Sequence, residues 1–452
     1  MTTSEFIAQH RMSNPRDLAL QSRRYPDVDM PYALNQIQGW QTARQKLPSW
    51  AACDGVVYPP HLNMEQCSSE PTARYKQEVV ERWLSIVGQS VDSARMADLT
   101  GGFGVDFSFT SRCFAEATYV ERNESLCGVV SGNLPRLGIS NAHVVCAEAE
   151  EWLASAEPQT MLFLDPARRD EHGSKTVLIA DCTPDVEALL PQLMSKSRFV
   201  VIKLSPMLDW HKAVADLQGA VREVHIVSVG GECKELLLVL AANVKTDVQV
   251  VCIDIQPKPD SDGFYPRSEF KYSISLNAND QASANNSTLN PQHSTLNIQP
   301  STLNIPHSTF HIQHCGSAAT TQHSTLNIPH STFLYEPNSS VMKAGCFGEI
   351  AHAYGVSAVS SNSHLFLSAD RVEGFPGREF AIDGVTTMNK RQLKQLLGDL
   401  KQANIAVRNF PLSVAELRKR LKLRDGGNAY IFATTTADGD HVLLVTHKRV
   451  DE

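Results

Sequence analysis

The sequence contains no long apolar run, no paired cysteines and no excess of positive charge. No stretch of its 452 residues approaches the roughly eighteen apolar residues of a membrane-spanning helix, and no apolar run follows a basic start as in a secretory signal. The ten cysteines are scattered without a C-x-x-C pair, which suits reduced thiols better than disulfides or a zinc site. We therefore expect a cytoplasmic globular protein without a membrane segment or a metal site.

The formal net charge of −8 argues against a protein whose whole surface binds nucleic acid. The charge is uneven, however, because residues 380–452 carry twelve Lys and Arg against eight Asp and Glu. A local basic face on this C-terminal segment is compatible with that composition. The hydrophobic fraction of 42% is ample for real cores, and the length leaves room for roughly two to four domains.

Charged residues are absent between Gln281 and Tyr335. A seven-residue unit repeats there, from STLNPQH at Ser287 to STLNIPH at Ser324. Because each unit combines few large apolar residues with recurrent Pro, it sustains neither a helix nor a core. We predict that residues 281–333 form a disordered low-complexity insertion. Six histidines within it lack a rigid frame and are not expected to bind metal: His293, His307, His311, His314, His323 and His330.

Between residues 94 and 242 the sequence alternates short apolar runs with helix-length segments, which is typical of a parallel sheet covered by helices on both faces. The end differs, because apolar runs at 224–229 and 234–240 flank Gly230 and Gly231 and indicate an antiparallel hairpin. A parallel sheet closed by such a hairpin is unusual among dinucleotide-binding folds. The expected parallel strands are residues 94–99, 117–120, 142–146, 161–164 and 199–204.

A glycine-rich turn follows the first strand, in the stretch MADLTGGFGVD at residues 96–106. Gly101, Gly102 and Gly104 permit positive φ and let the backbone approach a nucleotide-like ligand. The third glycine of the dinucleotide fingerprint G-x-G-x-x-G is missing, which disfavours a pyrophosphate. The carboxylate of Asp98 suits instead the cationic amino group of S-adenosylmethionine. A NAD-dependent oxidoreductase is the alternative enzyme, and a simple packing turn is the structural alternative.

Acidic residues follow the second and third strands. Glu121 ends the second strand, where its carboxylate can accept two ribose hydroxyls. Glu148 follows the third strand and can accept the exocyclic amine of an adenine, while Ala149 supplies a backbone amide. Because the carboxyl ends of parallel strands meet at one edge of a sheet, we expect these residues to line the same crevice as the glycine turn.

The fourth and fifth strands end in residues suited to a reacting substrate. The fourth leads into LDPARRD, where Pro166 fixes the backbone so that Asp165 can point at one reacting group. Arg168 can contact a phosphate or stack on a base, or it can pair with an acid that follows it. Lys203 lies at the end of the fifth strand and reaches the same edge. Four consecutive strand ends are thus predicted to converge.

The segments before and after this α/β pattern also have recognisable elements. Residues 1–90 have helix-forming composition punctuated by Pro and predict a small helical cap, with helices at 5–10, 17–24, 32–46 and from Pro71. A second α/β unit follows the insertion, with strands at 379–382 and 405–409, helices at 389–402 and 413–421, and a hairpin of 429–434 with 441–446.

The last helix of that unit begins with a capping box, Ser413 followed by Glu416. The helix and its exit carry five cations within seven residues, which form either a solvated face or a phosphate-binding patch. These cations are Arg418, Lys419, Arg420, Lys422 and Arg424.

These motifs resemble the class I S-adenosylmethionine-dependent methyltransferases. DLTGGFGVD resembles the cofactor loop of that family and LDPAR its substrate-presenting loop. More narrowly, EQCSSEPTARYK, LDPARRD, KLSPMLDW and GGECKELLL resemble a bacterial branch in which a ferredoxin-like unit and a THUMP-like domain follow the methyltransferase domain. The cofactor-binding residues that the resemblance implies are Asp98, Thr100, Gly101, Gly102, Gly104, Asp106, Glu121, Glu148 and Ala149.

The resemblance implies an α/β fold with a Rossmann-like seven-stranded methyltransferase sheet at 91–245, after the helical cap at 1–90. A connecting strand region at 246–280 precedes the insertion, the ferredoxin-like unit covers 334–378, and the α+β THUMP-like domain covers 379–452. Since THUMP domains in other proteins bind RNA, the resemblance also implies an RNA substrate, transfer or ribosomal RNA, with no obligate protein partner.

Direct methyl transfer is the implied reaction, with Asp165, Pro166 and Arg168 at the reaction centre. Lys203, Arg418, Arg420 and Lys422 are the expected substrate-binding residues. Family members that methylate amino groups follow Asp-Pro with Pro and an aromatic residue, and here Ala167 and Arg168 take those places, which leaves the methylated atom open. No cysteine lies beside Asp165, which disfavours a covalent pyrimidine mechanism. A non-catalytic RNA-binding protein with the same fold is the alternative outside enzymes.

Overall fold

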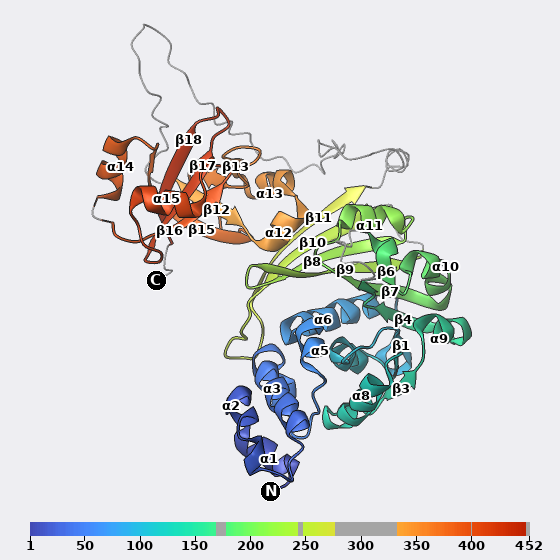
Figure 1. Cartoon of the computed structure of the whole chain (residues 1–452). Coiled ribbons are helices and arrows are strands. Elements are labelled where there is room, and N and C mark those ends of the chain that lie inside the picture. The colour runs from blue at the N-terminus through green and yellow to red at the C-terminus, as the bar shows by residue number, and fades with distance from the viewer. Residues whose placement is uncertain (169–177, 243–246, 276–331, 399, 449–452) are drawn as a thin grey trace. The chain divides into compact units, whose positions relative to one another are not determined.

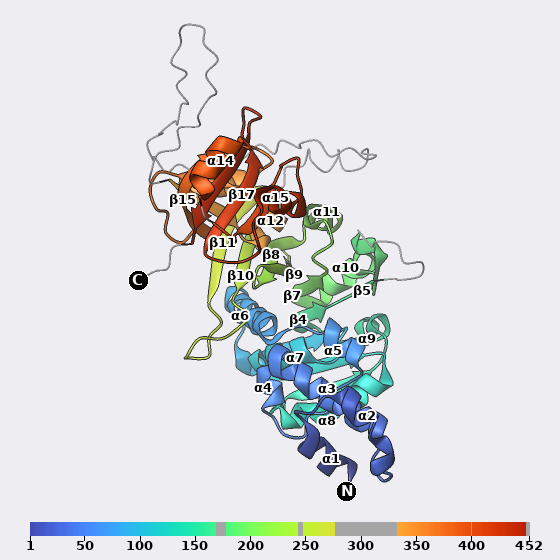
Figure 2. The same cartoon turned by 60° about the vertical axis from the view of Figure 1, so that its left-hand side comes forward.

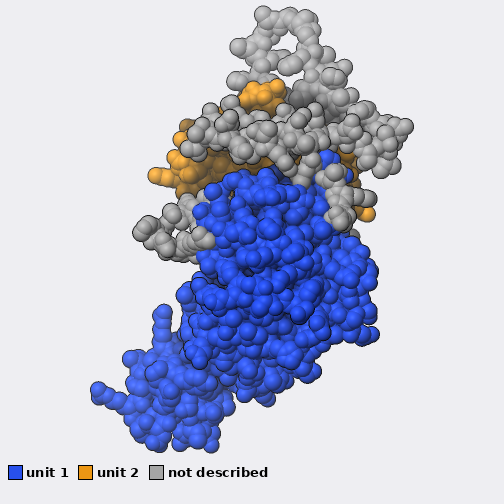
Figure 3. All heavy atoms as spheres, turned by 90° about the vertical axis from the view of Figure 1, so that its right-hand side faces the viewer, with its two compact units in different colours: residues 1–286 blue, residues 287–452 orange. Residues whose placement is uncertain are grey.

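The computed structural model describes residues 1–168, 178–242, 247–275, 332–398 and 400–448, without the side chain of Arg168. The chain divides into two compact units, residues 1–286 and 287–452 (Figure 3). The predicted insertion at 281–333 lies outside the described residues, apart from its last two. Among the helices of the described ranges, none has the length and apolar character needed to cross a bilayer.

The N-terminal region is helical, as predicted. Phe6, Leu18 and Ile37 give the first three helices a small core of their own. The sixth helix belongs instead to the main core, because Val80 and Trp83 pack in the same cluster as the sheet residues. The region is therefore more than a cap. Its helices are α1 (Thr3–His10), α2 (Pro15–Ala19), α3 (Met30–Lys46), α4 (Pro48–Ala51), α5 (His61–Gln66) and α6 (Glu70–Ile86).

A nine-stranded mixed sheet forms the centre of the first unit, in the order β11-β10-β8-β9-β7-β4-β1-β2-β3 (Figure 1). Neighbours among β3, β2, β1, β4 and β7 are parallel, and β9 lies antiparallel between β7 and β8. The predicted hairpin is thus confirmed. The strands are β1 (Arg95–Asp98), β2 (Glu116–Glu121), β3 (Ala142–Cys146), β4 (Gln159–Leu164), β7 (Ser197–Leu204), β8 (Val221–Val229), β9 (Glu232–Ala241), β10 (Asp247–Ile255) and β11 (Arg267–Ser275).

The sheet has two strands more than the seven predicted. Residues 246–280, predicted as a connecting strand region, supply β10, which runs parallel to β8, and β11, which runs antiparallel to β10. Val248, Val250 and Cys252 of β10 are fully buried, so this apolar run needs a neighbouring strand and a covering layer. The seven predicted strands remain contiguous, and the prediction missed only the extension beyond β8.

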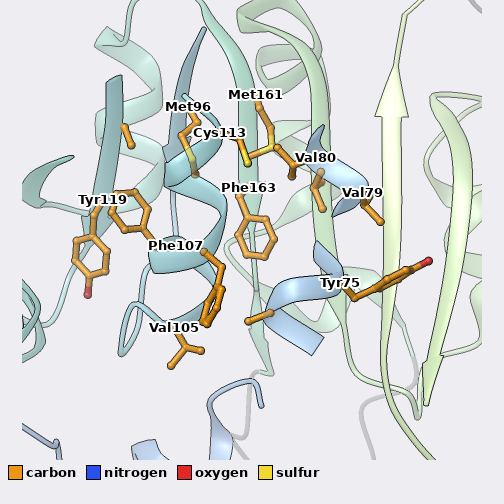
Figure 4. Packing of buried hydrophobic residues seen from close by; sticks show 14 of the residues in the cluster. Tyr75, Val79, Val80, Met96, Val105, Phe107, Cys113, Tyr119, Met161 and Phe163 are labelled. Atoms are coloured by element: carbon orange, nitrogen blue, oxygen red, sulfur yellow. The ribbon is translucent and has the colours of Figure 1, made fainter. Parts of the chain in front are cut away.

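Helices cover both faces of this sheet. Met161 and Phe163 of β4 pack in one cluster with Phe107 of α7 and Val80 of α6 (Figure 4). Leu162 alternates with them and is buried on the opposite face. The helices are α7 (Val105–Thr110), α8 (Glu124–Arg136), α9 (Ala149–Ser155), α10 (Val186–Lys196) and α11 (Trp210–Asp216), and a two-stranded ribbon pairs β5 (Ala167–Arg168) with β6 (Cys182–Thr183).

The second unit has its own seven-stranded sheet, in the order β13-β14-β12-β15-β18-β17-β16. β15 pairs with both β12 and β18, so the segments predicted as a ferredoxin-like unit and a THUMP-like domain share one sheet. Its strands are β12 (Phe333–Pro337), β13 (Ser357–Ala358), β14 (Phe366–Ser368), β15 (Gly377–Thr386), β16 (Asn404–Arg408), β17 (Ala429–Thr435) and β18 (His441–His447). Its helices are α12 (Ser339–Ala344), α13 (Phe347–Tyr354), α14 (Lys390–Leu397) and α15 (Val414–Leu421).

Local signals placed the last helices well. α15 starts at the predicted capping box, in which Ser413 and Glu416 bond each other's backbone amides. α14 is shorter than the predicted 389–402, because Gly398 takes a positive φ of 49° at its C-cap and ends the helix. α14 contacts β15 (Figure 2), and α15 contacts β16 (Figure 1).

Candidate active site

A cavity of about 270 Å³ opens at the carboxyl edge of the parallel strands. It is lined by residues from the ends of β1, β2, β3, β4 and β7, so the predicted convergence of strand ends is observed. The predicted site residues that line it are Asp98, Thr100, Gly101, Gly102, Gly104, Asp106, Glu121, Glu148, Ala149, Asp165 and Lys203.

The glycine turn wraps closely over a tyrosine ring. A Cβ added to Gly101 would lie 2.1 Å from the Tyr119 ring, so no larger residue fits there without movement. The Tyr119 hydroxyl donates to the carbonyl of Gly102 at 2.5 Å. Gly102 and Gly104 have φ of 54° and 78°, and Gly104 is the N-cap of α7. The turn therefore presents bare backbone to the cavity.

Glu121 fastens this turn to the second strand. Its Oε2 accepts from the Gly102 amide at 2.9 Å, and its Oε1 accepts from the Asn123 amide at 2.8 Å. Each carboxylate oxygen has a further acceptor site, so hydroxyls of a bound ribose can still be accepted. Glu148 lies half-exposed before α9, with Oε2 4.0 Å from Arg122, and Ala149 is the first residue of that helix.

Asp98 is a buried carboxyl group at the end of β1. It is 2% exposed and accepts a hydrogen bond from the Thr100 amide at 3.0 Å. Burial raises the pKa of Asp98 to about 8. The Thr100 hydroxyl in turn accepts from the backbone amide of Asp165 at 2.6 Å, which links the ends of β1 and β4.

Asp165 is ion-paired at the end of β4. Its Oδ2 lies 2.5 Å from Lys203 Nζ, and Lys203 also lies 3.2 Å from Asp106 Oδ2. Burial alone would lower the pKa of Lys203, but the carboxylates of Asp165 and Asp106 hold it well above its ordinary value. Burial alone would raise the pKa of Asp106, yet Lys76 and Lys203 hold it below its ordinary value.

Asp106 thus faces two lysines from the protein itself. It was predicted to bind the cofactor, and although it lines the cavity it is only 8% exposed. Lys76 lies 3.0 Å from its Oδ1, on the side opposite Lys203. Its contacts indicate a role in holding lysines, and cofactor contact stays a prediction.

Sequence reasoning missed a contribution from the N-terminal region. The Ser68 hydroxyl donates to Asp106 Oδ2 at 2.7 Å. Lys76 of α6 has a fully buried side chain and pairs with Glu235 of β9 at 2.6 Å. A signal was present, because Lys76 falls between Ala73 and Val80 on the buried stripe of an amphipathic helix.

A second, larger cavity of about 940 Å³ adjoins the first. The two share Gln66, Cys67, Ser68, Asp165, Ala167 and Lys203. Pro166 lines the second cavity only, so Asp165 and its proline lie where the two spaces meet. The backbone of Arg168 pairs with Cys182 in the β5–β6 ribbon, and its side chain lies outside the described atoms.

The predicted basic patch belongs to the second unit. Arg418 is paired with Asp425 at 2.5 Å, whereas Arg420 and Lys422 are exposed. Their participation in the same site as the cavities stays a prediction.

Comparisons with known proteins agree with this architecture. Residues 333–376 match the family model of a ferredoxin-like domain, and residues 377–448 match a THUMP domain-like model. The crystal structure of a "putative methyltransferase" from Porphyromonas gingivalis W83 superposes with a TM-score of 0.74 at 27% identity, covering 99% of this chain and 98% of that one. An uncharacterized RNA methyltransferase from Thermosynechococcus vestitus is 32% identical over 117 residues, 25% of each chain, so this chain spans about a quarter of that relative.

The chain therefore has the fold of the S-adenosylmethionine-dependent methyltransferases. Its C-terminal residues form the ferredoxin-like and THUMP domain-like segments that the sequence motifs implied.

Proposed function

We propose that this protein transfers a methyl group directly from S-adenosylmethionine to RNA. The observation that carries the proposal is the cavity in which a buried acid, a bare glycine turn and a second acid meet beside Asp165. Methyltransferase similarity over nearly the whole chain supports the reaction class. The THUMP domain-like segment and the RNA methyltransferase relative support RNA as the acceptor, either transfer or ribosomal.

The residues of the cavity fit the proposed methyl donor. Asp98 is a buried carboxyl that accepts a hydrogen bond from Thr100, so a cationic amino group would compensate its charge. Gly101 to Gly104 leave room for a close approach, Glu121 would accept ribose hydroxyls, and Glu148 would accept the adenine amine. S-adenosylmethionine supplies a methyl group that its sulfonium already activates.

Because the methyl group is already activated, the protein mainly has to align the acceptor and exclude water. Alignment of this kind is worth up to ~7 to 11 kcal/mol. Asp165 would orient the acceptor or take its proton, from a position shared by both cavities. Pro166 holds the backbone beside it, and Arg168 would hold the substrate. The acceptor would therefore enter through the second cavity.

Binding of the substrate outside the reaction centre is assigned to exposed cations of the second unit. Arg420 and Lys422 are exposed and would contact phosphates, while Arg418 is engaged by Asp425. We place the reaction in the cytoplasm, because the ten cysteines are scattered without a C-x-x-C pair, which suits reduced thiols.

Calorimetric titration with S-adenosylmethionine, with NAD as a control ligand, tests the cofactor assignment. We expect stoichiometric binding of S-adenosylmethionine only, weakened at least tenfold in Glu121→Ala and unchanged in Glu116→Ala, which changes an acid at the other end of β2. Preference for NAD would overturn the assignment in favour of an oxidoreductase.

Transfer of a labelled methyl group to RNA from cells lacking the protein tests the reaction. Label in RNA is the expected result. Binding of S-adenosylmethionine and RNA without transfer would instead identify a non-catalytic RNA-binding protein.

A further inference from the structure

Two buried lysines share one carboxylate and one hydroxyl. Lys76 Nζ lies 3.0 Å from Asp106 Oδ1, and Lys203 Nζ lies 3.2 Å from Asp106 Oδ2. Ser68 Oγ donates to Asp106 Oδ2 at 2.7 Å and accepts from Lys76 at 3.1 Å and from Lys203 at 3.3 Å. The two lysines come from α6 and β7, so this arrangement joins the N-terminal region to the sheet.

A carboxylate ends the series on each side. Glu235 pairs with Lys76 at 2.6 Å, and Asp165 pairs with Lys203 at 2.5 Å. The side chain of Glu235 is 6% exposed and that of Asp165 is 40% exposed, so the series runs from a buried end to the reaction centre. We name it the buried charge chain; its members alternate in sign and are Glu235, Lys76, Asp106, Lys203 and Asp165.

The hydrogen bonds of Lys203 define its role. An ammonium group has three N–H donors, and those of Lys203 have acceptors on Asp165, Asp106 and Ser68. None remains for a substrate in this arrangement, although Lys203 was predicted to bind one. The position of the Asp165 carboxylate therefore depends on how firmly Asp106 and Ser68 hold Lys203.

A gain in folding stability is a poor explanation for the buried charge chain. Replacing a buried ion pair by apolar residues of similar volume is often neutral or stabilising. Burying Lys76 on the apolar stripe of α6 costs desolvation free energy, which its ion pairs offset. A role in the site is therefore a better explanation of this lysine than a gain in stability. The Asp165 side chain, at the reaction centre, is 40% exposed, whereas the side chains of the other four members are at most 11% exposed.

We propose that Lys76 is a positioning residue for methyl transfer: with Ser68 it fixes Asp106, so that Lys203 holds the Asp165 carboxylate toward the acceptor. This inference rests on the proposed function. Lys76 lines neither cavity, so it acts on Asp165 only through the buried charge chain.

The test compares two ion pairs that start from the same helix, the fully buried Lys76 and the partly exposed Arg82, each with a buried glutamate. Lys76→Met alone would leave the buried Glu235 carboxylate without its ion-pair partner, so the variant is Lys76→Met with Glu235→Met, which removes one charge of each sign. The control is Arg82→Met, because Arg82 also lies on α6 and pairs with Glu223 of β8, but its pair reaches neither cavity.

The measurements are the Kd for S-adenosylmethionine by calorimetry, and kcat, KM and the pH profile for methyl transfer to RNA from cells lacking the protein. For the double variant we expect a Kd within threefold of wild type, a kcat at least tenfold lower, and an acid limb of the rate profile shifted to higher pH. Arg82→Met should lose thermal stability but keep kcat within threefold. If the double variant does not fold, Ser68→Ala replaces it, with an expected three- to tenfold loss of kcat.

A folded double variant, or Ser68→Ala in its place, with wild-type kcat and pH profile would overturn the inference while leaving the proposed function intact. An equal loss of kcat in Arg82→Met would also overturn it, because the effect would then be structural. Absence of transfer by the wild-type protein would overturn the proposed function itself.

Discussion

The Thr100 hydroxyl accepts a hydrogen bond from the backbone amide of Asp165 at 2.6 Å and so joins the glycine turn to the reaction centre. Thr160 makes the equivalent hydrogen bond at the opposite ends of the same two strands, where its hydroxyl accepts from the Arg95 amide at 3.1 Å. One threonine thus ties β1 to β4 at the cavity and the other ties them far from it.

Thr100→Val should therefore weaken both cofactor binding and methyl transfer. Leaving a buried amide without an acceptor costs about 1–3 kcal/mol, which corresponds to roughly five- to 150-fold if it falls on the site. Thr160→Val should lower stability to a similar extent in chemical denaturation without changing the Kd for S-adenosylmethionine. Equal Kd values in the two variants would mean that the Thr100 bond is only structural.

The ionisation of Asp98 should make cofactor binding depend on pH. Because its pKa is raised to about 8, the carboxyl is protonated at pH 6 and must lose its proton to pair with a cationic amino group. Affinity for S-adenosylmethionine should therefore rise between pH 6 and 7.5, by up to about tenfold per pH unit. Calorimetry in buffers of different ionisation enthalpy would detect the released proton, and Asp98→Asn should remove the dependence. A flat wild-type profile would contradict this role.

Gly101 should tolerate no side chain. A Cβ at this position would lie 2.1 Å from the Tyr119 ring, so Gly101→Ala should destabilise the protein by about 1–3 kcal/mol and weaken cofactor binding. Gly128→Ala is the matched control in α8, where no atom lies within 4 Å of the added Cβ, and it should stabilise by about 0.4–1 kcal/mol. Denaturant unfolding measures both changes, and similar values would argue against close packing of the turn.

Asp165 should be needed for turnover rather than for cofactor affinity. Asp165→Asn keeps an acceptor for Lys203 but removes the charge and the proton acceptor, so kcat should fall about 10²-fold or more. Calorimetry should give a Kd for S-adenosylmethionine within about threefold of wild type. Asp209→Asn, at the N-cap of α11, should leave kcat unchanged. A loss of only a few-fold would show that Asp165 merely supports the backbone.

Much of the fold was predictable because it depends on short sequence patterns such as apolar runs, glycine pairs and helix caps. Alternating apolar runs placed the parallel strands, Gly230 and Gly231 placed the hairpin, and Ser413 with Glu416 placed the start of α15. The addition of β10 and β11 was not predictable in this way, because the free edge of β8 is a property of the assembled sheet.

The residues of the candidate site likewise fall into those that local sequence patterns predict and those that depend on contacts between distant segments. The ends of parallel strands must meet, so Asp98, Glu121 and Asp165 could be placed in one cavity from the sequence. The contacts of Ser68 and Lys76 could not be predicted, because their partners Asp106 and Glu235 lie 38 and 159 residues away in the sequence. Contacts at such separation depend on how α6 packs against the sheet rather than on a motif.

Ser68 and Lys76 precede the predicted methyltransferase segment, residues 91–245, and β10 and β11 follow it. A fragment with those bounds would keep the cofactor turn but leave Asp106 without Ser68 and Lys76, and Lys203 without Ser68. The methyltransferase segment of this chain is therefore not self-contained. The unit to express or transplant in protein engineering is the stretch from the first helices through β11.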